Sequence, residues 1–350
     1  MDYFSWLAQE DLLSSEALTV RAQALPVDDR DQLVHDVFFP RQDVPSVELS
    51  SLEDIDFRPV SDRREWNTRG RHLHTITPQA RELEMIPIES YFKIEEREMQ
   101  KLVEQTFGNE AVMRQILKSS IPGRIDALVQ ANRRRMEYDA LRAWATGSII
   151  AMNPQTGATQ TVSYGFDSAR MSTAGTAWNN GAVNAYNELI AWLEDGIDAV
   201  GSAVGVIMRR ATFAAIQTDA PQGLDAIPLT RAQLQDRISQ DLGIPFTFYL
   251  LEHRADKYND GGLAVTRTNY WPAEQVALVP AGLVIGSMAH APLVRGFSLA
   301  NVARDAQIDV RGMGVFREIA GNGREATWEC QINAFPVPLE SRVWVIDAGV

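Results

Sequence analysis

The stretch IPGRIDALVQANRRRMEYDALRAWATG, residues 121–147, contains the clearest helical pattern of the chain. Pro122 stands where a first helical turn tolerates a missing N–H, and Gly147 stands where helices commonly end. One stripe between them repeats with a period of about 3.6 residues, as an amphipathic helix requires. Its positions are Ile121, Ile125, Leu128, Asn132, Met136, Ala140 and Ala143, with Leu141 and Trp144 widening it. At about 1.5 Å per residue this helix would be roughly 35–40 Å long, so we expect other elements to pack along it.

Composition and charge narrow the classes of function. The chain has 350 residues, 45% of them hydrophobic, which is enough for a large core and more than one domain. Its formal net charge of −13 argues against binding of free duplex DNA through a basic face. Residues 1–54 hold 12 acidic and 3 basic side chains, and this segment therefore carries −9 of the charge.

The single cysteine, Cys330, excludes a disulfide within the chain and fits a reducing compartment, where a buried, inert thiol is expected. No apolar run reaches the length of a membrane span, and the first residues lack a basic region ahead of an apolar one. We therefore expect a cytosolic protein without a membrane partner.

Residues 1–53 read as an extended arm. Residues 1–24 could form a short amphipathic helix, but their acids and the break at Pro26 do not favour a core element. Its only concentrated apolar residues are Phe38-Phe39-Pro40 and the stretch from Val44 to Leu49. They must be covered, either by another subunit or by a distant part of the same chain.

Residues 54–90 show neither a helical period nor a clear core strand, and they are too long for an ordinary connection. They are also too apolar for a disordered linker, since they include Trp66, Leu73 and Leu83. A long two-stranded excursion that packs on a neighbouring molecule satisfies both facts. A β-hairpin folded on its own domain is the alternative.

The remainder of the chain divides into two regions, with a boundary near Ser172 where small residues become frequent. In the first, we expect helices at 94–107 and 110–119, the long helix, and a hairpin of strands 149–152 and 159–163. In the second, we expect helices at 183–197, 211–217 and 230–242, the last of them begun by a cap at Thr230. Strands are expected there at 203–208, 246–251, 263–268, 276–279 and 283–285. Residues 257–262 would form the turn between 246–251 and 263–268. Finally, 308–319 should pair with 324–333, before a last strand at 343–346.

The residues that usually carry chemistry form no recognisable set. Among the five histidines only His72 and His74 are close in sequence, and no carboxylate or thiol spacing completes a metal site. The glycine pairs at 312–314 and 321–323 lack the other residues of a phosphate loop. Ser287 lacks the second glycine of a hydrolase elbow, and Cys330 lies in a strand pattern without an evident base. We expect no catalytic residue, no metal and no cofactor.

The order of these parts resembles the major capsid protein of tailed bacteriophages, specifically the lambda-like major head protein family with the Hong Kong 97-type fold. The segments that carry the resemblance span nearly the whole chain. They are Phe38-Phe39 followed by VPSVELSSLED, PQARELEMIPIESYFKIEERE at 78–98, RRRMEYDALRAWATGSI at 133–149, Val204 to Met208, WPAEQVALVPAG at 271–282, and CQINAFPVPLESRVWVIDAGV at 330–350.

The resemblance implies an α+β fold of six parts. These are an N-terminal arm at 1–53, an extended loop at 54–90, a peripheral domain at 91–170 with the spine helix 121–147 and the hairpin, an axial domain at 171–305, strands returning to the peripheral domain at 306–335, and a C-terminal strand at 336–350.

It also implies a function and partners. Copies would assemble into hexamers and pentamers of an icosahedral head that encloses double-stranded DNA without sequence-specific binding and matures from a procapsid. Scaffold, portal and cementing proteins would be partners, and the protein would be found in the virion and, during assembly, in the host cytoplasm.

One departure bears on how a shell would be held together. Some shells of this fold are crosslinked through a lysine of the extended loop, but residues 54–90 contain no lysine. Non-covalent contacts or a cementing protein should replace that bond. The expected contact residues between subunits are Arg63, Arg64, Trp66, Arg69 and Arg71 in the loop, Phe38 and Phe39 in the arm, and Arg133, Arg134 and Arg135 on the spine helix.

Two other readings are open. The first is an encapsulin-like nanocompartment shell protein of the same fold, which holds an enzyme cargo; such proteins tend to be shorter and to lack so long an acidic arm. The second is a soluble α/β enzyme whose site is not evident in the sequence. Its support is the α/β stretch from 176 to 285, and its weakness is the missing polar cluster.

Overall fold

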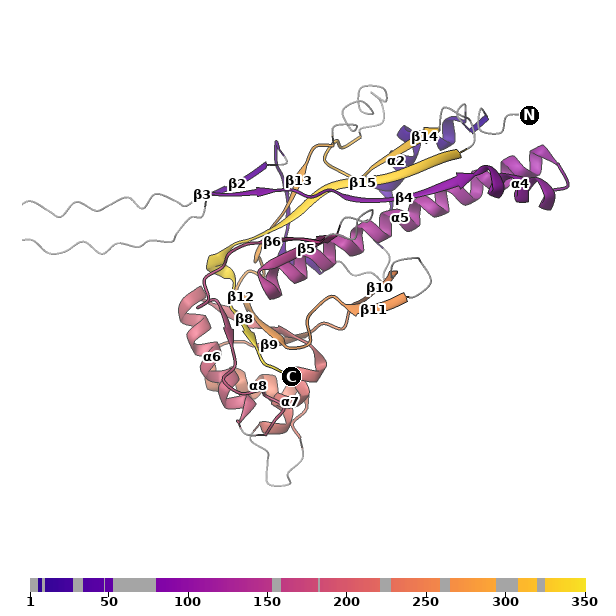
Figure 1. Cartoon of the computed structure of the whole chain (residues 1–350). Helices are drawn as coiled ribbons and strands as arrows, with labels where there is room; N and C mark the ends of the chain where they lie inside the picture. Colours follow the sequence, from indigo (N-terminus) through magenta and orange to yellow (C-terminus); the bar gives the residue numbers. More distant parts are fainter. Residues whose placement is uncertain are drawn as a thin grey trace, which may run out of the picture.

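The computed structural model describes residues 6–7, 10–27, 34–46, 48–52, 80–152, 159–181, 183–220, 228–258, 265–293, 308–319 and 325–350. Figure 1 shows an elongated body built on a long helix and a sheet, with a second α/β region below one end of it. The predicted α+β architecture is confirmed.

The long helix is α5, Glu110–Thr146, with 37 residues. Asn109 caps its start by accepting a hydrogen bond from the N–H of Val112, and Gly147 ends it in the left-handed conformation with φ 62°. The predicted separation into helices 110–119 and 121–147 is wrong, because Pro122 lies inside one continuous helix. The buried residues Met113, Leu117, Ile121 and Ile125 continue one stripe past the proline. Their packing outweighs the hydrogen bond that proline removes.

The body's sheet is organised around β15, Glu325–Pro338. The first part of β15 pairs antiparallel with β14, Gly314–Ile319, on one side and with β4, Ile88–Glu95, on the other. Its last part pairs with β13, Gly286–Ala291, which pairs in turn with the parallel strand β1, Arg41–Asp43. Alternate residues of β15 are buried. Five strands from distant parts of the chain therefore meet along one surface.

The helix α5 packs along β15 and β4. Buried Asn132 of α5 donates a hydrogen bond from Nδ2 to the carbonyl of Cys330, at 3.0 Å. The thiol of Cys330 is also buried, and this burial raises its pKa to about 12. The cysteine is therefore a buried, protonated thiol, as predicted.

Strand β4 and the helix after it differ from expectation. Residues 88–95 form a strand, whereas the sequence analysis assigned them to the loop and to the start of a helix. The helix is α4, Glu96–Gln105, and it contacts β4 and α5. Side chains of β4 alternate between exposed and half-buried, with Ile94 alone buried. This weak pattern becomes a strand because β15 supplies eight consecutive pairing partners.

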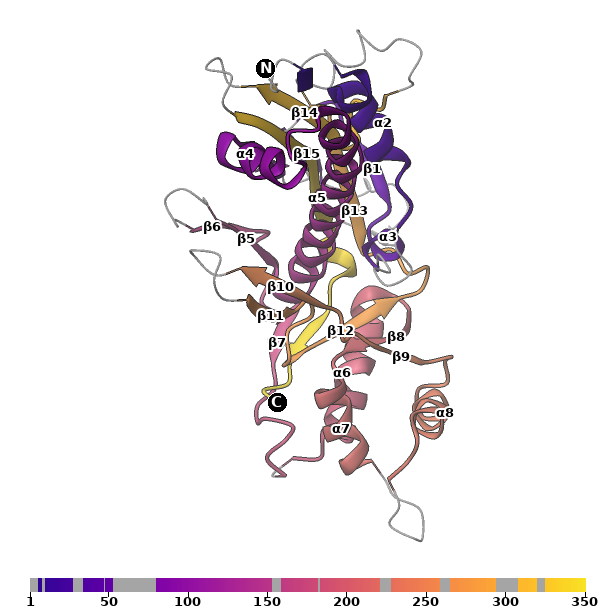
Figure 2. The same ribbon diagram turned by 90° about the vertical axis from the view of Figure 1, so that its right-hand side faces the viewer.

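The N-terminal segment is a core element, which corrects the prediction of an extended arm for residues 11–24. It forms the 3-10 helix η1, Asp11–Leu13, and the helix α2, Ser15–Ala24, which packs on β14 and α5 (Figure 2). Leu13, Leu18 and Ala22 are buried there. Two polar side chains of α2 cover the free edge of β14: Ser15 accepts from the N–H of Arg317, and Thr19 bonds both backbone groups of Val315. An edge strand that would otherwise stay unpaired is thereby satisfied.

Two further strands, β2, Glu48–Leu52, and β3, Ala80–Glu84, pair antiparallel. In Figure 1 they form a two-stranded ribbon that points away from the body. This is the base of the predicted two-stranded excursion, and residues 53–79 lie outside the described part of the chain.

The hairpin after α5 is present as predicted, with β5, Ser148–Met152, antiparallel to β6, Thr159–Ser163. The buried residue Tyr164, which follows β6, donates a hydrogen bond to the carbonyl of Pro336 at 2.6 Å. The hairpin is therefore tied to the end of β15.

The second region holds a five-stranded sheet in the order β7-β16-β12-β8-β9. Its strands are β7, Met171–Thr173; β16, Val345–Asp347; β12, Gln275–Pro280; β8, Ala203–Met208; and β9, Thr247–Leu250. Three helices pack against it: α6, Ala185–Val200; α7, Arg210–Asp219; and α8, Arg231–Leu242. As predicted, Thr230 caps α8, and it does so in a reciprocal capping box with Gln233.

Three strand assignments in this region differ from the prediction. Strand β9 pairs in parallel with β8 and does not form a hairpin with 263–268. The hairpin consists instead of β10, Arg254–Tyr258, and β11, Val265–Asn269. The strand expected at 283–285 is β13, three residues later and in the body's sheet. Sequence periodicity finds strands but not their partners, so a four-residue strand beside a turn is easily assigned to the wrong neighbour.

We predict that replacing Thr19 by valine destabilises the chain by about 1–3 kcal/mol, because Val315 would keep a buried N–H and C=O without partners. Thr19 is fully buried, and its hydroxyl accepts from Val315 N at 2.8 Å and donates to Val315 O at 3.2 Å. Urea unfolding of the unassembled chain measures the change. The matched control, Thr19→Ser, keeps the hydroxyl and should lose less. Equal stability of Thr19→Val and wild type would show that α2 does not complete the β14 edge.

Candidate assembly surfaces

Phe38 and Phe39 lie inside the subunit, with 3% and 0% of their surface exposed. Phe38 is the last residue of the short helix α3, His35–Phe38, and Phe39 follows it; this helix contacts α5 and β13. The ring of Phe38 lies against Trp144 of α5 at a centroid distance of 4.9 Å. Their own chain covers both side chains, which corrects the expectation that they contact a neighbouring subunit.

The three consecutive arginines of α5 differ in their surroundings. Arg133 donates to the carbonyls of Leu25 at 2.6 Å and Pro26 at 3.1 Å, and so holds the end of the α2 segment on α5. Arg135 pairs with Asp139 at 2.8 Å and donates to the carbonyl of Ile150 in the hairpin. Arg134 is exposed and remains a candidate contact. The other candidates, Arg63, Arg64, Trp66, Arg69 and Arg71, lie outside the described residues.

The root of the β2–β3 ribbon is fixed to the body's sheet. The preceding strand β1 pairs with β13, and the N–H of Val44 donates to the carbonyl of His290 at 2.9 Å. Arg41 of β1 pairs with Asp309, and Arg311 donates to the carbonyl of Val44. These contacts therefore anchor the segment from which the ribbon leaves the body.

Sequence reasoning missed a buried charged cluster at Glu137 of α5. This carboxylate is 1% exposed and accepts the N–H groups of Val34 and His35 at 3.0 and 2.9 Å. The ring of His35 contacts Glu137 at 2.8 Å through Nδ1 and Asp36 at 3.0 Å through Nε2. His253, after β9, lies 3.7 Å from the other oxygen of Glu137. The signal that could have revealed this cluster is the position of Glu137 directly after Met136, a residue of the predicted apolar stripe.

The cluster keeps its charges despite burial. Burial alone would lower the pKa of His35, but hydrogen bonds with Asp36 and Glu137 raise it to about 9. Burial alone would raise the pKa of Glu137, but His253 and His35 hold it below its usual value. The pair ties the segment before β1 to the long helix, and His253 extends the contact to the second region.

An exposed apolar surface lies where α4 turns into α5. Phe107 is 98% exposed, and both Phe107 and Gly108 have left-handed backbones, with φ 52° and 70°. Val112 and Ile116 on the first turns of α5 are 43% and 39% exposed. A bulky residue in this conformation costs about 1 kcal/mol or more, and exposed apolar patches mark contact sites. The turn is at the end of the body farthest from the second region (Figure 1).

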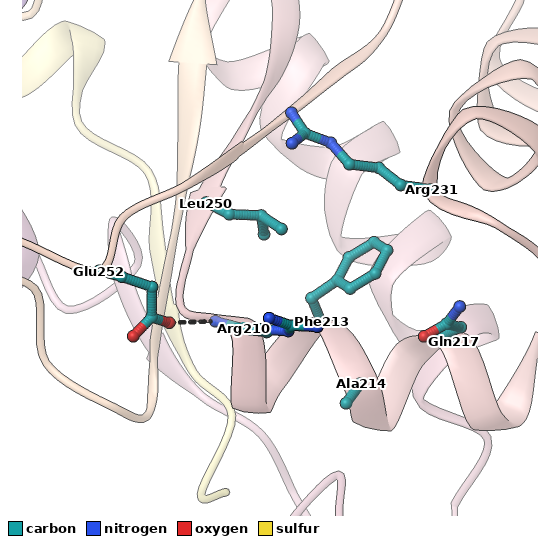
Figure 3. Close-up of a pocket in the computed structure, with 7 residues that line it drawn as sticks. All are labelled: Arg210, Phe213, Ala214, Gln217, Arg231, Leu250 and Glu252. Carbon is teal, nitrogen blue, oxygen red and sulfur yellow. Dashed lines mark hydrogen bonds between the residues drawn. The ribbon is translucent and has the colours of Figure 1, made fainter.

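A groove of about 430 Å³ lies between α7, α8 and β9 in the second region (Figure 3). Its lining residues are Arg210, Phe213, Ala214, Gln217, Arg231, Leu250 and Glu252. The carboxylate of Glu252 is already occupied, since it accepts the N–H of Arg210 at 2.9 Å and lies within 4 Å of the guanidinium groups of Arg209 and Arg254. The lining contains no nucleophile paired with a base, so the groove does not have the geometry of a catalytic site.

Two other features bear on function. Within the described ranges, no three side chains of His, Cys, Asp or Glu gather into a possible metal site. None of the helices that the structure describes has the length and apolarity needed to cross a membrane.

Of the comparisons with known proteins, only the one with solved structures found matches. No protein-family model matches the chain, and no curated protein matches it in sequence. A solved phage-related protein from Bordetella bronchiseptica RB50 matches with a TM-score of 0.50 and 10% identity, over 95% of this chain and 96% of that one. A putative prophage capsid protein from E. coli CFT073 has a TM-score of 0.49, 13% identity and coverages of 99% and 97%. The capsid of Myoviridae phage XM1 has a TM-score of 0.49, 12% identity and coverages of 93% and 94%.

The first of these matches shows the fold. The chain shares the fold of that phage-related protein over almost the full length of both. The described residues contain the parts predicted for a Hong Kong 97-type fold, namely a spine helix, a projecting two-stranded ribbon, a body sheet and a separate α/β region.

The charged cluster predicts a pH dependence. The pKa of His35 is about 9 in the folded chain, against an ordinary value of 6.5. Its charged ring therefore stabilises the fold fully below pH 6.5, and this contribution is lost as the pH rises through 9. The loss should be at most about 3 kcal/mol. We predict that urea unfolding between pH 6.5 and 10 shows a steeper loss of stability for wild type than for His35→Asn, which keeps a neutral donor. Parallel losses in the two chains would show that His35 is not charged in the fold.

Proposed function

We propose that this chain is the major capsid protein of a tailed double-stranded DNA bacteriophage, and that its copies form the hexamers and pentamers of an icosahedral head. The observation that carries the proposal is the fold match to a phage-related protein over 95% of this chain and 96% of the other. The match includes the body and the axial region together, and the resemblance of the sequence to lambda-like major head proteins points the same way.

The geometry suits a subunit that tiles a shell. The body formed by α5 and β15 is elongated, the β2–β3 ribbon projects beyond it, and the α/β region lies at one end (Figure 1). In this proposal the body forms the wall, the α/β region gathers around the capsomer centre, and the ribbon reaches a neighbouring subunit. Each Å² of apolar surface covered by such contacts contributes about 25 cal/mol to the free energy of association, so small contacts repeated over a shell give a large total.

The role proposed is structural, not catalytic. The groove of the second region lacks a nucleophile and a free base, and the net charge of −13 suits a container whose wall does not grip its DNA. Because residues 54–90 contain no lysine, a cementing protein or non-covalent contacts would hold the expanded head. Scaffold and portal proteins would be the other partners, with the virion as the final location and the host cytoplasm as the place of assembly.

The proposed domain limits follow the six predicted parts, with two changes suggested by the strand pairings. The peripheral domain gains α2 and β13, which pack on or pair within the body's sheet. The axial domain gains β16, which pairs with β12 and β7.

Electron microscopy and sedimentation of the expressed chain, with and without the neighbouring head genes, test the proposal. Closed shells or ring-shaped capsomers are the expected result. A stable monomer that binds a small molecule would instead support the enzyme reading, and shells that retain a co-purified enzyme would support the nanocompartment reading.

A single substitution tests the role of the loop. We predict that Trp66→Ala lowers the yield of closed shells strongly while leaving the unfolding midpoint of the unassembled chain close to that of wild type, because Trp66 would fill a pocket on a neighbour. Sucrose-gradient sedimentation measures the shells, and Leu73→Ala in the same loop is the comparison. A mutant chain that melts early while its shells still form would place the excursion on its own subunit.

A further inference from the structure

The groove between α7, α8 and β9 has a basic rim over an apolar floor. Phe213 and Leu250 line it, and Arg210 and Arg231 reach it from the first residues of two helices (Figure 3). Arg231 is held in place by Gln235 and by the carbonyl of Phe248 on β9. Arg210 is exposed, and within the described part of the chain its guanidinium makes no hydrogen bond or ion pair. The groove therefore presents two guanidinium groups, that of Arg231 held by hydrogen bonds and that of Arg210 available to a ligand.

The acid in this groove does not neutralise its rim. Glu252 accepts the backbone N–H of Arg210, and its second oxygen lies 3.7 Å from Arg209 and 3.8 Å from Arg254. The carboxylate is thus shared between two arginines outside the lining. An anionic side chain entering the groove would meet Arg210 first.

The opposite charge is displayed on α6. Glu194, Asp195 and Asp198 are exposed on consecutive turns, and none of them pairs with a basic side chain of the described residues. Leu189, Trp192, Leu193 and Gly196 form the buried side of the same helix. Since α6 contacts α7 and the sheet through that buried side, its acidic side faces away from the groove of its own subunit.

We propose that this groove receives the acidic face of α6 from a second copy of the chain. The inference rests on the proposed function, because it describes how neighbouring axial regions would meet within one capsomer. Two different, complementary surfaces on one subunit make a head-to-tail contact, and such contacts close into rings when the rotation between copies allows. Complementary charges also fix register and disfavour other pairings.

A phosphate backbone is the competing occupant of a basic groove. The structure favours a protein surface, because the apolar side chains of Phe213 and Leu250 in the lining have no apolar counterpart on a phosphate backbone. The acidic helix provides a partner with three separate carboxylates and apolar neighbours, among them Ala191.

Charge reversal tests the pairing. We expect Arg210→Glu to lower the yield of assembled particles at least about tenfold, because like charges would meet in the contact. The subunit should stay folded, since a glutamate at the first residue of α7 is favoured by the helix dipole. The triple change Glu194→Lys, Asp195→Lys and Asp198→Lys should have the same effect. A chain that carries all four changes should recover most of the wild-type yield.

The control is Arg237→Glu, which makes the same change of charge on α8 outside the groove and should assemble normally. If Arg210→Glu misfolds by circular dichroism, Arg210→Gln replaces it. Wild-type yield for the folded Arg210 variant, or no recovery in the combined chain, would overturn the inference while leaving the proposed function intact. Weaker binding of a short DNA duplex by Arg210→Glu, with normal assembly, would assign the groove to phosphate and also overturn it. Failure of wild type itself to assemble would count against the proposed function.

Discussion

The packing of α5 against β15 is the contact on which the rest of the subunit depends. The two elements depend on each other: the 37-residue helix draws most of its stability from packing of its apolar face, and the 14-residue strand needs partners for its backbone. The strand covers the apolar face of the helix, and the helix covers one face of the sheet around the strand. The hydrogen bond from the buried amide of Asn132 to the carbonyl of Cys330 fixes the register between them. The strands β4, β13 and β14 pair with β15, α2 contacts α5, and β1 joins the sheet through β13.

This arrangement explains why the subunit is elongated and why it leaves surfaces for neighbours. An elongated body has a large surface relative to its core, so the ribbon and the turn at Phe107 both remain on the outside. The buried charges have a different role. Glu137 holds both backbone N–H groups and the ring of His35, and so connects the segment that leads into the ribbon with the spine. The position of the ribbon is therefore coupled to the helix and not only to the strand before it.

The sequence predicted what depends on local pattern. The amphipathic period and Gly147 placed the end of the spine helix, Thr230 placed the start of α8, and turn residues placed the hairpin of β5 and β6. It did not predict what depends on distant partners. The strand β4 exists because β15 lies beside it, α2 is a core element because it covers the edge of β14, and Pro122 is tolerated because the stripe on both sides of it is buried. Of the predicted contact residues, Phe38 and Phe39 are buried within their own subunit. The sequence could not show this, because exposed and buried aromatic pairs look alike in sequence. The groove at Arg210 and the cluster at Glu137 join residues far apart in the chain, which no local pattern reveals.

Native-state hydrogen exchange of the unassembled chain tests the central claim directly. If α5 and β15 depend on one another, the amides of residues 117–141 and 326–335 should exchange through the same, slowest opening reaction, with equal opening free energies and equal dependence on denaturant. Exchange of the α5 amides at an opening free energy more than about 2 kcal/mol below that of β15 would show that the helix detaches while the sheet persists, and would contradict the account.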